Sequence, residues 1–164
     1  MRFSPLNSLP RSGRATIAGD VSGIFGGETA GGVQYDRRMD PVWRDAIVGG
    51  DVAAVQTLLS HGADVDARDR YGQTALMLAA LHGHDAIVAM LLAAGAALNV
   101  AAKYGLSALM LAVVGGHAES ARRIARAGAD RTLRGTGAPG FAGKTAYDLA
   151  IAAAMHDLAV EIAP

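Results

Sequence analysis

The chain has 164 residues, of which 51% are hydrophobic, but 35 residues are alanine, so the composition predicts one helical domain with thin layers. Fifteen Lys and Arg residues balance fifteen Asp and Glu residues, and this zero net charge argues against a nucleic-acid partner. Cysteine is absent, which excludes disulfides, a thiolate nucleophile and a cysteine-based zinc site.

Residues 1–36 differ in composition from the rest of the chain. They contain seven glycines and two prolines, and they have no lasting hydrophobic period. Arg11 and Arg14 interrupt the one apolar stretch, which argues against a secretory signal. We predict a flexible N-terminal extension. Because arginine and serine without early acids also typify organellar presequences, that interpretation stays open, as does a misassigned start codon.

From residue 37 onward the sequence repeats itself with a period of 33. Residues 71–79, YGQTALMLA, return as residues 104–112, YGLSALMLA, and the Gly-His pair at 83–84 returns at 116–117. Self-similarity at a fixed interval is the signature of stacked supersecondary units. We predict a repeat domain over residues 37–164, with units at about 37–69, 70–102 and 103–135 and a partial unit at 143–164.

Each unit is expected to hold two short antiparallel helices and an extended tip. Thr74 and Ser107 have hydroxyls suited to capping a helix, and the apolar residues that follow them recur at helical spacing. Gly83 and Gly95 mark the ends of the two helices in one unit. Residues 99–105 lack a helical period and contain a turn glycine, which predicts a hairpin-like projection.

The first and last units depart from this pattern. In the first, Asp40 and Pro41 predict a capped helix start, and Trp43 takes a core leucine position, where we expect it to shield the end of the stack. The last unit follows the third by 38 positions rather than 33, so five residues are inserted between Arg134 and Phe141.

This pattern resembles the ankyrin repeat, whose unit contains Thr-Pro-Leu-His, Gly-His, Leu-Leu and Gly-Ala-Asp followed by Asn. The resemblance covers about residues 37–164 and implies an all-α solenoid of stacked helix-turn-helix units with short hairpin-like tips. Ala75 and Met77 stand where the family has proline and histidine, so we expect the fold with less rigidity. The resemblance also implies that His84 and His117 begin second helices and bond locally.

The same resemblance implies a non-enzymatic module, an adaptor or regulator, that binds a protein partner through its concave face and loop tips. The positions that vary in the family contribute nothing to stacking between units. In this chain they combine aromatic, cationic and apolar side chains, which suit a protein interface. These ten candidate partner-binding residues are Arg68, Arg70, Tyr71, Gln73, Leu81, His82, Lys103, Tyr104, Leu106 and Val114.

The inserted segment contains two short nucleotide-binding patterns. Residues 135–140 satisfy G-x-G-x-x-G, and residues 138–145 read APGFAGKT, a Walker A pattern with alanine for its first glycine. A phosphate site of this kind needs a buried strand before the loop, and residues 126–133 do not have that character. The alternative function is a nucleotide- or phosphate-binding protein that uses the loop 135–145 and Lys144.

No nucleophile, base and orienting group occur together, so we predict no enzyme activity and no cofactor. His82 and His84 come nearest to metal-ligand spacing, but no further ligand completes a site, and we predict no metal. Residues 86–102 form the longest uncharged run, which Gly95 and Asn99 interrupt, so we expect no membrane span. We expect a cytoplasmic monomer, while a periplasmic or organellar location stays open.

Overall fold

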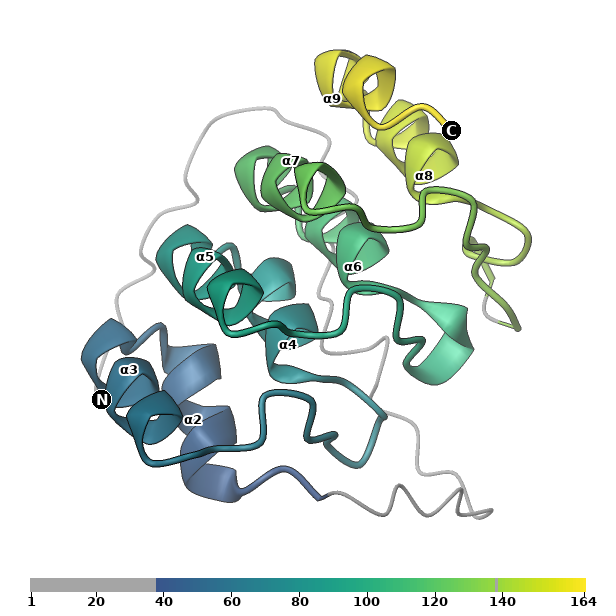
Figure 1. The fold of residues 1–164 in the computed structure, drawn as a ribbon. Helices are drawn as coiled ribbons and strands as arrows, with labels where there is room; N and C mark the ends of the chain where they lie inside the picture. The colour runs from purple at the N-terminus through teal and green to yellow at the C-terminus, as the bar shows by residue number, and fades with distance from the viewer. Residues whose placement is uncertain (1–37, 138) are drawn as a thin grey trace, which may run out of the picture.

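The computed structural model describes residues 38–137 and 139–164, and within these ranges the chain forms eight α-helices. The helices form four antiparallel pairs that stack one after another from α2–α3 to α8–α9 (Figure 1). The predicted all-α repeat fold is therefore confirmed, while the predicted extension at 1–36 lies outside the described residues. The helices are α2 (Pro41–Gly49), α3 (Val52–Ser60), α4 (Ala75–His82), α5 (Asp85–Ala93), α6 (Ala108–Val114), α7 (Ala118–Arg126), α8 (Ala146–Ala152) and α9 (His156–Glu161).

The first helix of each pair begins at a side-chain cap. In α2 the Asp40 carboxylate accepts a hydrogen bond from the Val42 N–H at 2.8 Å, and Pro41 fills the first helical position. Thr74 and Ser107 each accept a bond from the N–H three residues on, at 3.4 Å. These bonds satisfy N–H groups that a helix start otherwise leaves without a partner. The predicted caps are thus confirmed at α2, α4 and α6.

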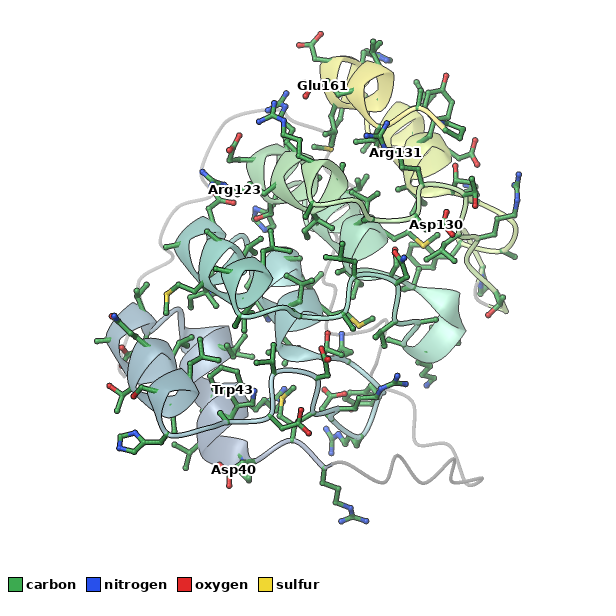
Figure 2. All side chains as sticks on the ribbon, in the orientation of Figure 1. Asp40, Trp43, Arg123, Asp130, Arg131 and Glu161 are labelled. Carbon is green, nitrogen blue, oxygen red and sulfur yellow. The ribbon has the colours of Figure 1, made fainter. Side chains whose placement is uncertain are left out.

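The core runs along the inner helices of the stack. All residues from 75 to 81 and from 108 to 114 are buried, so α6 is buried along its whole length and α4 is exposed only at His82. The outer helices bury only one face. Trp43 is 2% exposed and joins this core, so its side chain is part of the packing of the first pair (Figure 2). Burial of a large apolar side chain contributes about 1.5–3 kcal/mol, and this term holds the pairs together.

Side chains also tie each unit to the next through hydrogen bonds at the same repeat position. The Asp66 carboxylate accepts a bond from the Ala97 N–H at 2.8 Å. One unit further on, the Asn99 amide oxygen accepts a bond from the Asp130 N–H, also at 2.8 Å. These bonds hold consecutive loops in a fixed register, because each spans about one repeat length of the chain.

Histidines at the start of the second helices pack against glycines of the preceding unit. His84 Nε2 lies 3.0 Å from the Val48 carbonyl oxygen, so the expectation that this histidine bonds locally is wrong. The ring reaches back because Gly50 leaves room: a Cβ on Gly50 would lie 2.7 Å from His84 Cε1. A Cβ on Gly83 would meet the His117 ring in the same way. Both glycines also have a positive φ, 71° and 72°, which side chains rarely adopt.

The last unit contains both of its helices, although α8 has seven residues and α9 has six. Its equivalent of Gly83 is Ala154, which has a φ of 56°. Ala154 is exposed, so its side chain has space, but its backbone keeps the left-handed strain.

None of the helices in the described ranges has the length and apolar character that a membrane span requires.

These two turns predict opposite effects of exchanging glycine and alanine. Gly83→Ala adds left-handed strain and a clash with His117, so we expect it to lower the free energy of unfolding by about 3 kcal/mol. Ala154→Gly relieves strain where no neighbour intrudes, so we expect a gain of about 0.5 kcal/mol after the entropic cost of glycine. Urea unfolding followed by circular dichroism measures both. An equal loss in the two variants would contradict the proposed role of the His117 contact.

Candidate functional site

The loops between successive helix pairs project on one side of the stack (Figure 1), and their outer segments are residues 67–73, 100–106 and, leaving out residue 138, 133–144. We call these three segments the tip surface. In the first, Asp69 shapes the turn: its carboxylate accepts bonds from the Tyr71 N–H at 2.8 Å and the Gln73 N–H at 2.9 Å. An aspartate that bonds its own backbone favours a turn over a helix. The local sequence therefore fixes where Tyr71 projects.

The second tip is a tight turn that includes a short 3-10 helix, η1 (Lys103–Gly105). Its two sides are joined by a bond from the Ala102 N–H to the Leu106 carbonyl at 3.0 Å. Tyr104 has a φ of 65° and a ψ of 19°, the left-handed region that favours glycine. Such a conformation in a side-chain-bearing residue costs about 1–3 kcal/mol and persists only where the surroundings impose it.

Backbone hydrogen bonds join the tips to one another. The Lys103 N–H donates to the Tyr71 carbonyl at 3.0 Å, and the Thr136 N–H donates to the Tyr104 carbonyl at 2.6 Å. Both acceptors are tyrosines at the same repeat position. The three tips therefore form one row in which the two tyrosines hold equivalent places.

A cation lies over each tyrosine ring. Arg70 Cζ is 4.7 Å from the centre of the Tyr71 ring, and Lys103 Nζ is 4.9 Å from the centre of the Tyr104 ring. Both rings are partly exposed. A cation over an aromatic face is stabilised by about 0.5–1 kcal/mol at exposed sites. The tip surface thus presents the same aromatic and cationic pair twice.

The structure divides the ten predicted partner-binding residues into two groups. Six lie at the surface or are partly exposed: Arg68, Arg70, Tyr71, His82, Lys103 and Tyr104. The other four are buried, with exposed fractions of 3% for Gln73, 7% for Leu81, 0% for Leu106 and 4% for Val114.

Repeat position explains the four buried side chains, which correct the expectation that all ten face a partner. Gln73 and Leu106 directly precede the buried caps Thr74 and Ser107, where the chain turns inward to the helix. Leu81 and Val114 lie in the last turns of α4 and α6, which are enclosed almost all round.

Residues 43–135 match the family model described as ankyrin repeats, in three copies. The chain belongs to the ankyrin-repeat family. No curated protein matches the chain. Ankyrin repeats indicate a protein–protein interaction module, and the family is typically non-enzymatic. The matched range includes the first two tips of the row and the start of the third.

In this ankyrin stack His82 and His84 lie near one another at the turn between α4 and α5. The rings of His82 and His84 stack with their centres 6.0 Å apart. Burial, followed by the positive potential of His84, His117 and Arg44, lowers the pKa of His82. Within residues 38–137 and 139–164, no group of three His, Cys, Asp or Glu side chains is placed to hold a metal ion.

The glycine-rich loop of the ankyrin domain uses its own backbone for hydrogen bonds. Within it, the Gly135 N–H donates to the Lys144 carbonyl and the Gly143 N–H donates to the Gly135 carbonyl, both at 2.9 Å. The Thr145 N–H donates to the Asp148 carboxylate at 2.8 Å. A phosphate would need such N–H groups free and converging. The loop geometry therefore gives no support to the nucleotide alternative.

The third tip contains residues that sequence reasoning left out of the candidate site. Thr136 bonds Tyr104, and Arg134 Nη1 donates to the Gly143 carbonyl at 2.6 Å. Phe141 is partly exposed in the same segment. Thr136 and Phe141 were missed because the five-residue insertion breaks the 33-residue register by which the other tips were found, whereas Arg134 precedes the insertion and keeps the register of Arg68. Phe141 follows the insertion and lies in sequence between Arg134 and Lys144, and this aromatic residue between two cations is the signal in the sequence that could have identified the third tip.

The lowered pKa of His82 predicts that acid weakens the ankyrin stack. In the unfolded chain this imidazole titrates near its ordinary value of about 6.5, so the unfolded state binds more protons just below that pH. We therefore expect the free energy of unfolding to fall as the pH drops below about 6.5. His82→Gln should flatten this dependence, measured by urea unfolding from pH 8 to pH 5. An unchanged slope in the variant would remove His82 as its source.

Proposed function

We propose that this ankyrin-repeat chain is a non-enzymatic adaptor or regulator that binds a protein partner through the tip surface. The observation that carries the proposal is the row of backbone-bonded tips with a cation over each tyrosine. Aromatic residues and arginine are enriched in the energetically important parts of protein interfaces. Because backbone bonds already hold the row, a partner would bind it without a large ordering cost.

The concave face contributes less than the family resemblance implied. Leu81 and Val114 are buried, so the inner helices offer His82 as the predicted contact that is exposed. A partner would therefore gain its specificity from the tips, with the histidine at the edge of the interface. We propose that the chain acts as a monomer in the cytoplasm.

Removing both tyrosines tests this proposal. Tyr71→Ala with Tyr104→Ala deletes the aromatic part of both pairs, while the backbone bonds of the row can still form. We expect an unchanged helical circular dichroism spectrum. We also expect the amount of each protein captured by the wild-type chain to fall at least tenfold, because truncating two central aromatic residues weakens binding. Quantitative mass spectrometry after affinity capture provides the measurement.

Tyr147→Ala supplies the matched control, because this partly buried tyrosine lies in α8 rather than in a tip. We expect it to keep the captured set. If the double variant captures the same proteins in the same amounts as wild type, the tips are not the interface and the proposal is wrong.

Calorimetry with ATP and with NAD tests the alternative function. We expect no binding heat, because the N–H groups of Gly135, Gly143 and Thr145 are already bonded within the chain. Binding by the wild-type chain that Lys144→Ala abolishes would favour a phosphate site in the loop 135–145 over the interaction module.

A further inference from the structure

Positive charge collects on the tip surface although the whole chain is neutral. The described residues of its segments, 67–73, 100–106, 133–137 and 139–144, contain five Lys or Arg residues and one acidic residue, Asp69. A local excess of one sign creates a field that attracts oppositely charged partners, even where the net charge is zero. The five cationic residues are Arg68, Arg70, Lys103, Arg134 and Lys144.

The single tip carboxylate is committed to the fold. Asp69 is 8% exposed, and its Oδ1 accepts two backbone N–H bonds within its own turn. Two acids in the adjoining loop segments are used similarly: Asp66 accepts the Ala97 N–H, and Asp130 accepts the Thr132 N–H at 2.8 Å. Acids therefore organise the loop backbones, while cations occupy the outward turns.

The two cation–tyrosine pairs are suited to binding carboxylates. Arg70 is exposed beside Tyr71, and Lys103 is placed beside Tyr104 in the neighbouring tip. A carboxylate that approaches either pair meets a charged N–H donor, and charge-assisted bonds of this kind are about twice as strong as neutral ones. The Lys103 backbone N–H donates to the Tyr71 carbonyl at 3.0 Å, so the two pairs lie in adjacent, bonded tips.

We infer that the tip surface binds an extended acidic segment of a protein partner. This inference rests on the proposed function and assigns the chemistry of its partner. A long nucleic-acid polyanion fits less well, because α2, α3 and the loop that follows them carry Asp45, Asp51 and Asp64, and because two ring positions give little room for stacked bases.

A labelled peptide of about twelve residues, half of them glutamate, provides the direct probe, with fluorescence anisotropy on the full chain as the measurement. We expect the glutamate peptide to bind and a peptide with glutamine at the same positions not to bind. Raising the salt from about 50 to about 300 mM should weaken binding about tenfold, because salt screens exposed charges. Equal binding of the two peptides, or none by either, would overturn the inference, as would tighter binding of a single-stranded oligonucleotide.

Charge reversal locates the binding site. Arg70→Glu with Lys103→Glu should weaken peptide binding at least tenfold. Arg123→Glu with Arg126→Glu makes the same charge change on α7, where Arg123 lies away from the tips (Figure 2), and should preserve most of the affinity. If both double variants lose peptide affinity equally, binding depends on the net charge of the chain and not on the tips, and the inference is wrong.

Partner capture separates this inference from the proposed function. If the tyrosine double variant loses the captured proteins while the tip charge-reversal variant retains them, the tips bind a partner but not through acidic residues. If both variants retain capture, the proposed function itself fails. If both variants lose the captured proteins, the result supports both the tip interface and its binding of an acidic segment.

Discussion

Close packing of inner helices is the constraint on which the whole molecule depends. Helix α4 contacts both α2 and α6, and α6 contacts α8, so each inner helix buries its side chains against its neighbours in the stack. Ala79, Ala80 and Ala112 are fully buried on these helices, and their small size lets the helices approach closely. No pair could hide its apolar surface alone, which is why the stability of such stacks is shared between neighbours.

Loop geometry follows from this helix packing. Once α4 and α6 lie side by side, Asp66 and Asn99 can bond the next loop, and the tyrosine carbonyls can accept bonds from the next tip. The row of tips is therefore a consequence of the repeat spacing rather than of any single loop sequence. A substitution deep in the stack, such as one at Leu109, would therefore displace the row of tips although Leu109 lies outside them.

Much of this architecture could be predicted from the sequence, because the 33-residue period places caps, turn glycines and apolar stripes directly. Exposure was harder to predict. Gln73 and Leu106 share a position that the family uses for partners, yet both are buried in the turn that leads into the cap. His84 could not be placed either, since its bond to Val48 depends on a neighbouring unit. The third tip was missed because its insertion breaks the period.

Among the described residues, the outer face of the last pair lacks the cover that the second and third pairs have. Ile151 is 43% exposed, whereas Val113, at the same repeat position, is 1% exposed, and Val160 on α9 is 78% exposed. Local opening costs least where few contacts must break, so hydrogen exchange should be fastest at α8 and α9 and slowest at α4 and α6. Fraying would then stay away from Tyr71 and Tyr104, whose loops adjoin the pairs that open last.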